Sequence, residues 1–454
     1  MLGERFPYGR APFWLALIAA VSTALVVATQ LRAGAAKPDL VLATFAANHM
    51  DAYRDVVPAF ERKHGVKVSL QLVHQRALQT RLQNAMLAGT AVPDLVELAF
   101  GDIGYFTRGP LADVGFVDLT DRLEREGYRQ RLVESRLSLW SSRKRVFALP
   151  HDVHPVMLAY RADILAELGI DPSAIETWDD FVALRQKVVK DLDGDGILDR
   201  YLIDLPVGES WGLETLLLQR GISLFDADGN VALDHPDTVD TIVWYIHQVE
   251  GKNRIATQCG WGQPLMKAMR DGLALFFLAP DWRTGSMQQE APNVKGLFRI
   301  MPLPAWKKGG RRTSAWGGSG LAITRASAHG ELAWELAKTL YFDSAELGRR
   351  YRFTNILPSL KDSWSLPEFK EPNPFFGGQA IGTLFAEYAD DTPADWSTPY
   401  KTRGSDRLGD VFLRGLEHFR AHGDAGLHET VTRELHRVRA ELERYIGRNV
   451  LVKH

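Results

Sequence analysis

The sequence predicts an α/β protein with two lobes. The chain has 454 residues, which is longer than most single domains, so two domains are the natural expectation. In its first third, short apolar segments alternate with amphipathic helical segments, an order typical of a parallel sheet with helices on both faces. An extended segment with two prolines, residues 146–160, follows, and a second set of strands and helices begins after it. We therefore expect the chain to cross between the lobes at this segment.

The composition excludes some classes of function. Hydrophobic residues make up 45% of the chain and charged residues 24%, as in ordinary globular proteins. The net charge of −2 gives no electrostatic basis for binding nucleic acid. Cys259 is the only cysteine, so no intramolecular disulfide can form, and a chain of this length can bury a large core without one. We expect a monomer that requires no cofactor.

The N-terminus predicts export. Arg5 and Arg10 precede an uncharged run, residues 11–31, and small residues follow at positions 33–36. This pattern describes a signal peptide within residues 1–36, cleaved after Ala35 or Ala36. The run of about 20 residues is also long enough to span a bilayer, so an uncleaved anchor is an alternative. No cysteine follows the run, which argues against a lipoprotein. We expect a periplasmic or cell-surface protein.

The first unit contains three strands and two helices. We expect strands at 39–46, 66–73 and 95–100, and helices at 53–64 and 78–87. In parallel sheets, ligands bind beyond the carboxyl ends of the strands. The polar residues that follow these strand ends are Asn48, His49, His74, Gln75 and Asp102.

The remaining elements follow in order after the first crossing. Helices are expected at 161–168, 178–189, 213–220, 236–249 and 265–270, and a strand at 273–278. Residues 279–282 are expected to form a second crossing. Strands at 298–303 and 321–324 flank the glycine-rich loop 314–320, where we expect a third crossing. Residues 331–341 predict an amphipathic helix, 362–399 mostly loop, and 406–448 mostly helix.

Several stretches resemble the family 1 extracellular solute-binding proteins, the sugar-binding subunits of bacterial ABC importers. Their order along the chain is more specific than any one of them. They are residues 92–97 (VPDLVE), 109–113 (GPLAD), 148–152 (ALPHD), 158–163 (LAYRAD), 177–181 (TWDDF), 266–278, 302–304 (PLP), 317–324 (GGSGLAIT), 333–336 (AWEL) and 357–359 (LPS). Arg161 departs from the pattern, because the family usually has Asn after the tyrosine.

The resemblance implies a two-lobed periplasmic-binding-protein fold of type II, in which each lobe is a sheet flanked by helices and three hinge crossings join the lobes. The N-terminal lobe would comprise residues 39–148 and 284–323, and the C-terminal lobe residues 149–283 and 324–454. The ligand would lie in the cleft between them. Closure of the hinge would present the loaded protein to the permease subunits of an ABC transporter in the membrane.

The predicted cleft carries the groups that bind sugars. Pyranose rings stack on flat aromatic side chains, and planar polar groups bind their hydroxyls. Trp211, Trp282 and Trp316 lie in loops beside the crossings or strand ends and are the expected stacking residues. Gly317 and Gly318 would let the backbone approach the ligand. The expected polar contacts are Asn48, His49, Gln75, Asp102, His151, Asp152 and Arg283.

Residues 191–199 (DLDGDGILD) resemble the first nine positions of a calcium-binding loop. The side chains of Asp191, Asp193, Asp195 and Asp199 and the carbonyl of Ile197 are the candidate ligands of a structural Ca²⁺. The twelfth position is Leu202 rather than Glu, which removes the bidentate ligand. An acidic, solvated turn without metal is the alternative.

Motifs give little support for catalysis. The sequence contains no His-Glu-x-x-His pattern, and Gly-x-Ser-x-Gly occurs only once, at residues 208–212 (GESWG). His151 and His154 lie three residues apart on an extended segment, a spacing that does not favour a shared zinc ion. The sequence therefore favours a non-catalytic protein that captures a carbohydrate and delivers it to an ABC permease. The alternatives are a membrane-tethered sensor or receptor for another solute, such as a peptide, polyol or sugar phosphate, and an exported carbohydrate-active hydrolase.

Overall fold

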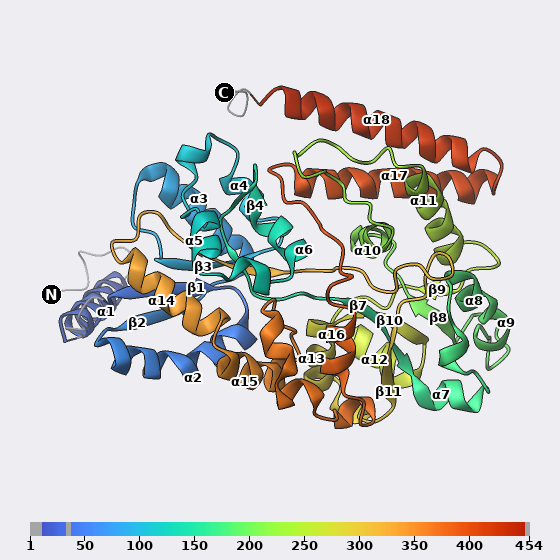
Figure 1. Cartoon of the computed structure of the whole chain (residues 1–454), viewed down its shortest axis with the longest axis horizontal. Coiled ribbons are helices and arrows are strands. Elements are labelled where there is room, and N and C mark those ends of the chain that lie inside the picture. The colour runs from blue at the N-terminus through green and yellow to red at the C-terminus, as the bar shows by residue number, and fades with distance from the viewer. Residues whose placement is uncertain (1–10, 33–37, 450–454) are drawn as a thin grey trace.

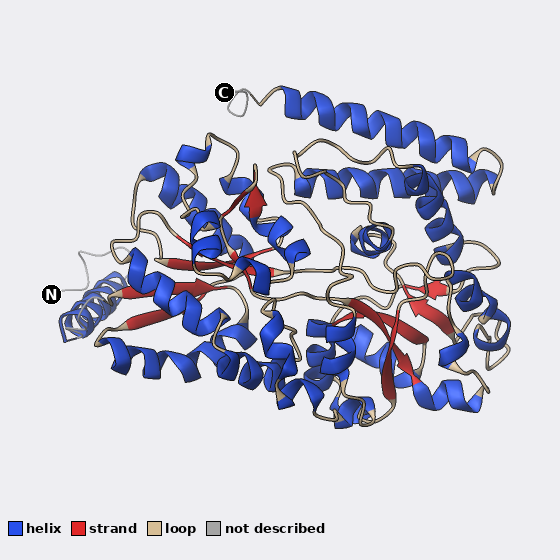
Figure 2. Cartoon of the chain, viewed as in Figure 1, coloured by secondary structure: helices blue, strands red, loops and turns tan. Residues whose placement is uncertain are grey.

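The computed structural model describes residues 11–32 and 38–449, and Figure 1 shows two lobes side by side, each built on one β-sheet. The strands of each lobe are covered by helices on the outside, and extended segments join the lobes at the centre of the molecule (Figure 2). The predicted α/β fold with two sheet-and-helix lobes is confirmed. The predicted cleavage site after Ala35 or Ala36 lies outside the described residues.

The N-terminal sheet has five strands in the order β2-β1-β3-β12-β6. β1 pairs in parallel with both β2 and β3, whereas β12 runs antiparallel to β3 and to β6. The sheet is therefore mixed rather than wholly parallel. Its strands are β1 (Leu40–Thr44), β2 (Val68–Leu72), β3 (Leu95–Ala99), β6 (Leu149–Pro150) and β12 (Ser319–Ile323).

The C-terminal sheet also has five strands, in the order β11-β7-β10-β8-β9. β7 runs antiparallel to both β11 and β10, and β8 runs parallel to β10 and β9. Three of its strands, β7, β8 and β9, do not appear among the predicted strands. The strands are β7 (Val156–Arg161), β8 (Tyr201–Asp204), β9 (Ala256–Thr257), β10 (Ala274–Pro280) and β11 (Phe298–Pro302).

Helices surround both sheets, and a short hairpin of β4 (Ser141–Ser142) and β5 (Arg145–Val146) lies on the N-terminal lobe. The predicted helix at 236–249 agrees with the observed one residue for residue, whereas α15 was not predicted. The helices before residue 200 are α1 (Ala11–Arg32), α2 (Ala47–His64), α3 (Gln75–Ala88), α4 (Ile103–Phe106), α5 (Thr120–Arg125), α6 (Glu134–Leu137), α7 (Ala162–Glu167), α8 (Trp178–Ala183) and α9 (Arg185–Val188). Those after it are α10 (Trp211–Gln219), α11 (Pro236–Val249), α12 (Gln263–Asp271), α13 (Asp281–Glu290), α14 (Gly330–Tyr341), α15 (Ser344–Thr354), α16 (Ile381–Glu387), α17 (Lys401–His422) and α18 (Leu427–Gly447).

The chain crosses between the sheets at three places, two of which were predicted. The first crossing, residues 151–155, joins β6 to β7, and the next, residues 303–318, joins β11 to β12. The crossing predicted at 279–282 is wrong, because Pro280 ends β10 and α13 begins at the next residue within the same lobe. The remaining crossing follows α15: Leu360 still packs in the N-terminal core, whereas Phe369 packs in the C-terminal core.

The lobe boundaries expected from the sequence need two corrections. Residues 284–302 belong to the C-terminal lobe, because β11 pairs with β7 over residues 298–302. Residues 330–341 belong to the N-terminal lobe, because Trp334 and Leu340 of α14 pack in one core with Leu40 of β1. The hydrophobic period of α14 predicts the helix correctly but cannot indicate which sheet it covers.

Helix α1 exposes large apolar side chains. The exposed fractions are 62% for Phe13, 67% for Leu15 and 60% for Ile18. Within the described residues, no helix reaches the length and mean hydropathy that a membrane span requires. Cleavage or retention of this N-terminal segment stays a prediction.

The packing of α14 leads to a prediction about stability. Trp334 is fully buried and its Nε1–H donates to Glu126 Oε2 at 3.0 Å. Replacing it with Ala removes an indole from the N-terminal core, and we expect a loss of about 3–5 kcal/mol in the free energy of unfolding. Urea denaturation measures this loss. Phe353→Ala is the control, because the Phe353 side chain is 64% exposed; equal effects of both substitutions would contradict the placement of α14.

Candidate ligand-binding cleft

Two connected cavities lie between the lobes. The larger, which we call the aromatic cavity, has a volume of about 620 Å³ and is lined by four tryptophans. The smaller, which we call the polar cavity, has a volume of about 350 Å³ and is lined by seven charged residues. Both are lined by Gln75, Phe100, Trp211, Trp316 and Gly317. They therefore form one cleft, with side chains from both lobes on its walls.

The tryptophans of the aromatic cavity form a cluster. The rings of Trp211 and Trp316 stack with centroids 4.0 Å apart and an angle of 3° between their planes. Trp261 lies 5.7 Å from Trp211, and Trp282 meets Trp316 edge-on at 5.2 Å. The four rings come from α10, from α13, from a loop before α12 and from the crossing at 303–318. The prediction missed Trp261, although its two glycine neighbours, Gly260 and Gly262, mark it as a loop tryptophan.

Hydrogen bonds fix the orientation of these rings. Glu209 accepts from Nε1 of Trp211 at 2.8 Å and from Nε1 of Trp261 at 3.2 Å. The Nε1–H of Trp282 donates to the carbonyl of Trp316 at 3.2 Å. Because the indole N–H groups of Trp211, Trp261 and Trp282 are already bonded, these three residues present their ring faces and C–H edges to a ligand. Such surfaces are suited to the apolar faces of sugar rings.

Arg283 does not line the cleft and was misplaced by the sequence analysis. Its side chain is buried, with Nη2 at 3.3 Å from Asp204 Oδ2 and Nη1 donating to the carbonyl of Leu278 at 2.8 Å. The guanidinium carbon lies 5.3 to 5.9 Å from the ring centroids of Trp211, Trp261 and Trp316. Arg283 therefore supports the tryptophan cluster from behind through cation–π contacts.

The N-terminal lobe supplies polar groups from the ends of its strands. Asn48 and His49 lie in the first turn of α2, Gln75 begins α3, and Asp102 follows β3. All four line the cleft, as the position of strand ends in α/β sheets predicts. Burial raises the pKa of Asp102 to about 6, although it accepts hydrogen bonds from Gln75 and the Ala99 N–H.

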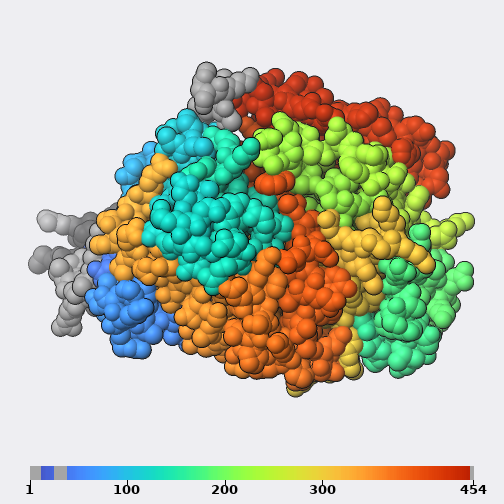
Figure 3. Space-filling view, in the orientation of Figure 1, coloured from blue at the N-terminus to red at the C-terminus, as the bar shows by residue number. Residues whose placement is uncertain are grey.

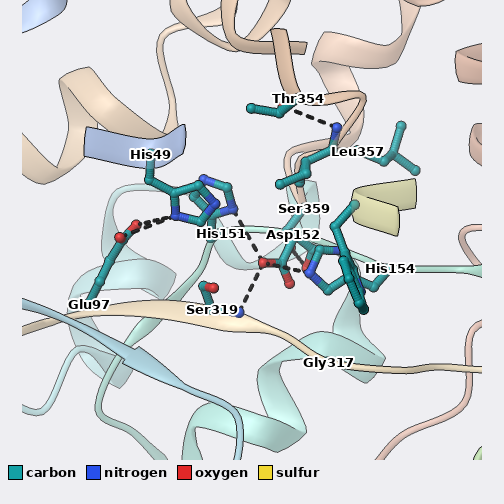
Figure 4. A network of polar contacts seen from close by, with 12 residues as sticks. His49, Glu97, His151, Asp152, His154, Gly317, Ser319, Thr354, Leu357 and Ser359 are labelled. Atoms are coloured by element: carbon teal, nitrogen blue, oxygen red, sulfur yellow. Dashed lines mark hydrogen bonds and ion pairs between the residues drawn. The ribbon is translucent and has the colours of Figure 1, made fainter. Parts of the chain in front are cut away.

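His151 and Asp152 are buried in the hinge rather than exposed to the cleft. Figure 4 shows them in a chain of polar contacts that includes His154. Asp152 Oδ2 lies 3.2 Å from His151 Nδ1 and 3.1 Å from His154 Nε2, and it accepts from the Ser319 N–H at 2.9 Å. The other ring nitrogen of His154 lies 2.5 Å from Asp281 Oδ1. The polar chain therefore joins the first crossing to β12 and to α13.

The charges in this chain are set by burial and by neighbours. Burial alone would lower the pKa of His154, but the carboxylates of Asp152 and Asp281 raise it to about 9. The pKa of His151 shifts in the opposite direction, because burial, together with the charges of Arg350 and His49, lowers it to about 3. At neutral pH a charged His154 thus lies between two carboxylates, while His151 is neutral.

A third carboxylate, Glu97 on β3, ends the polar chain in the N-terminal lobe. Its oxygens lie 3.2 Å from His49 Nδ1, and they accept from the hydroxyls of Tyr341, at 2.7 Å, Tyr53 and Thr44. The His49 ring stacks on His151 at 3.9 Å. Burial would raise the pKa of Glu97, but the histidines lower it below its usual range. His49 therefore connects the hinge to the cleft.

Gly317 and Gly318 line the aromatic cavity, as predicted. Their φ angles of 91° and 152° are in the region that side chains disfavour. A Cβ on Gly318 would lie 2.7 Å from Arg136 Nη2, and one on Gly317 would lie 3.3 Å from Trp282 Nε1. The loop thus requires glycine because the hinge and the tryptophan cluster pack against its backbone.

Of the twelve predicted ligand-binding residues, nine line the cleft and three do not. The nine are Asn48, His49, Gln75, Asp102, Trp211, Trp282, Trp316, Gly317 and Gly318. His151, Asp152 and Arg283 are the other three, and all are buried charged or polar groups behind the wall. Several lining residues carry no signal in the sequence, among them Phe45, Gln289, Glu214 and Lys401.

The predicted calcium loop is an exposed turn. The carboxylates of Asp191, Asp193 and Asp195 converge, with one oxygen of each within 4.8 Å of the others. The oxygens of Asp191 already accept from the N–H groups of Gly194 and Gly196, at 2.6 and 2.8 Å. Asp199 accepts from the Leu192 N–H at 2.7 Å. Three of the four candidate carboxylates thus converge, while that of Asp199 is not part of the group.

Comparison with known proteins identifies the class. Residues 46–346 match the family described as bacterial extracellular solute-binding protein, and the chain belongs to this family. It is 27% identical over 345 residues to an arabinooligosaccharide-binding protein of Bacillus subtilis, covering 74% of this chain and 77% of that protein. It is 24% identical over 326 residues to a lactose-binding protein of Rhizobium radiobacter, covering 70% of this chain and 73% of that one.

Solved structures share the fold. The sugar-binding protein MalE from Xanthomonas citri superposes with a TM-score of 0.72 at 19% identity, covering 90% of this chain and 99% of that one. A binding protein associated with an ABC transporter of B. animalis subsp. lactis, in complex with β-1,6-galactobiose, gives a TM-score of 0.65 at 20% identity, covering 90% and 97%. These likenesses confirm the expected periplasmic-binding-protein fold.

The buried carboxyl of Asp102 predicts a pH effect on stability. The pKa of Asp102 is higher in the folded protein than in the unfolded chain, so folding is coupled to the uptake of a proton near pH 6. The free energy of unfolding therefore rises as the pH falls from 7.5 through about 6. Asp102→Asn removes the charge, and we expect about 1–2 kcal/mol more stability at pH 7.5 and a smaller gain at pH 5. Urea denaturation at both pH values measures this. An equal effect at both values would show that Asp102 is not protonated near pH 6.

The response of the unfolding temperature to calcium tests whether the three carboxylates of the acidic turn bind the ion. We expect 1 mM Ca²⁺ to raise the unfolding temperature of the wild type and EDTA to reverse the rise. Asp193→Asn together with Asp195→Asn should abolish the shift. Asp226→Asn, in a similar turn outside the predicted loop, is the control. The same shift in the double variant, or no shift in the wild type, would establish the acidic turn without metal.

Proposed function

We propose that this protein captures an oligosaccharide in the cleft between its lobes and delivers it to the permease of an ABC importer. The observation that carries the proposal is the tryptophan cluster, whose ring faces and C–H edges line a cavity that both lobes share. The adjoining polar cavity offers carboxylates, amides and ammonium groups for hydroxyls, including Asp102, Gln75 and Lys401. Its relatives named for arabinooligosaccharide and lactose binding support a carbohydrate of more than one unit.

The hinge supports a binding cycle in which the lobes close on the ligand. Buried contacts of Asp152, His154 and Asp281 hold the crossings close together, so the lobes can turn about one region. The permease would recognise the closed, loaded arrangement. The N-terminal segment would direct export to the periplasm or cell surface, and the exposed apolar side chains of α1 are suited to a membrane during that step.

The proposed protein is a binder rather than an enzyme. Its relatives are named as binding proteins. Incubation with an oligosaccharide followed by chromatography of the products distinguishes the two. A binder returns the oligosaccharide unchanged, whereas release of shorter sugars would establish the hydrolase alternative.

A carbohydrate panel tests the ligand class. Arabinooligosaccharides, lactose and maltotriose should be compared by thermal unfolding, because a ligand at 100 times its Kd adds about 2.7 kcal/mol of stability. We expect one group of related sugars to shift the transition. Absence of a shift with every sugar would favour a sensor or a receptor for a non-carbohydrate solute.

Substitutions in the tryptophan cluster locate the site. We expect Trp282→Ala and Trp316→Ala each to weaken binding of the best sugar about tenfold or more, since loss of one aromatic contact costs about 1 kcal/mol or more. Titration calorimetry measures the affinity. Trp306→Ala removes an indole that lines neither cavity and serves as the matched control. Wild-type affinity in both cleft variants would place the sugar elsewhere.

A further inference from the structure

A third cavity lies outside the cleft and has its own chemistry. We call it the outer cavity; its volume is about 520 Å³, within the range of small-molecule sites. The β4–β5 hairpin and α6 of the N-terminal lobe line one side, and residues 227–230 and 394–400 of the C-terminal part line the other. In Figure 3 these segments, coloured teal, lime and orange-red, meet on the face toward the viewer.

The outer cavity is separated from the cleft by a segment that bridges the lobes. Ser138 Oγ donates to the carbonyl of Asp395 at 2.9 Å, and the Asp395 side chain pairs with Lys401 at 2.6 Å. Asp395 and Lys401 line the polar cavity, whereas their neighbours Trp396 and Tyr400 line the outer one. The two cavities thus lie on opposite sides of residues 394–400, and a ligand in one does not contact the wall of the other.

The outer cavity carries two cations that form no ion pair with a carboxylate of the described residues. The ion pairs formed within residues 38–449 include neither Arg143 nor Lys144, both of which line it. Arg143 is half-buried, and its Nη2 donates to the carbonyl of Thr107 at 2.9 Å. Burial lowers the pKa of its guanidinium without any carboxylate to oppose this. A partly desolvated guanidinium without an acidic partner can donate charge-assisted hydrogen bonds to an anion.

The backbone at these two cations is strained. Arg143 and Lys144 form the two-residue turn of the hairpin with φ angles of 49° and 63°. Such turns favour Asn-Gly, because glycine has no Cβ and Asn tolerates positive φ better than other residues with a side chain. Two long cationic side chains therefore occupy this turn against their backbone preference, and such strain clusters at functional positions.

The remaining lining suits a small solute with hydroxyls. Trp396 and Tyr400 offer aromatic surface, and Ser397 lines the same wall. The Ser397 hydroxyl has no hydrogen-bond partner within the described residues, so rotation about its χ1 can direct it toward a ligand. Across the whole lining, Arg129, Arg143 and Lys144 face only two carboxylates, Glu134 and Asp228. Arg129 already pairs with Glu134 at 2.6 Å.

We propose that the outer cavity binds a small anionic solute, a phosphorylated or carboxylated molecule of sugar size, through Arg143 and Lys144. The anion lies against the turn, and the body of the solute lies against Trp396 and Tyr400. This site is distinct from the proposed oligosaccharide cleft and does not depend on it.

Titration calorimetry of the full chain tests the proposal with three probes. Glucose 6-phosphate and glucuronate carry the two anionic groups on one sugar body, and glucose is the neutral probe. Arg143→Asn together with Lys144→Gly removes both cations and supplies the residues that the turn prefers, so this variant should fold at least as well as the wild type. Lys307→Ala with Lys308→Ala removes two exposed lysines elsewhere and is the matched control.

We expect glucose 6-phosphate or glucuronate to bind the wild type and the lysine control equally, and the turn variant at least tenfold more weakly. The stronger of the two probes identifies the anionic group. Trp282→Ala should leave this binding unchanged, which separates it from capture of sugar in the cleft. Three results would overturn the proposal: no binding of either anion, equal binding of glucose, or equal binding by the turn variant.

Discussion

The buried ion pairs of the hinge hold together segments that are distant in sequence. Asp152 and Asp281 lie 129 positions apart in the chain, and His154 bridges them with one ring nitrogen on each. Asp281 also accepts from the Leu357 N–H at 2.7 Å, and Asp152 from the Ser319 N–H. One connected set of contacts thus includes residues at or beside all three crossings. Taking such charges out of water costs several kcal/mol unless they are paired, so this pairing fixes where the lobes meet.

The cleft depends on a similar buried pair. Asp204 at the end of β8 holds Arg283, and the guanidinium in turn contacts three of the tryptophans. Asp204 also accepts from the Cys259 N–H at 2.9 Å, which positions the loop that carries Trp261. A charged residue beneath the wall therefore organises aromatic residues on its surface. The hinge and the tryptophan cluster both pack against the loop of Gly317, and together they leave no room there for a side chain.

Sequence reasoning was accurate where the signal is local. Strands β1, β3 and β10 and helices α11 and α14 follow from hydrophobic period and turn residues. It wrongly predicted a crossing at 279–282. A proline after an apolar strand marks where the strand ends, but it does not indicate whether a helix or a crossing follows. It also predicted that Arg283 and Asp152 contact the ligand, since polar residues near a crossing have the same sequence pattern whether they face a cleft or a buried partner.

By itself the sequence determined the α/β class, the first crossing, the family resemblance and most residues of the cleft wall, because strand ends and loop tryptophans are recognisable from neighbours within a few positions. Only the tertiary structure decided which sheet receives β11 and α14, which polar side chains are paired in the hinge, and that Trp261 joins the cluster. It also brought the hairpin cations opposite Trp396. These features depend on contacts between residues that are far apart in the chain, such as Tyr53 and Tyr341, which are separated by 288 positions. No local pattern encodes which distant partner a buried charge or an apolar face will meet.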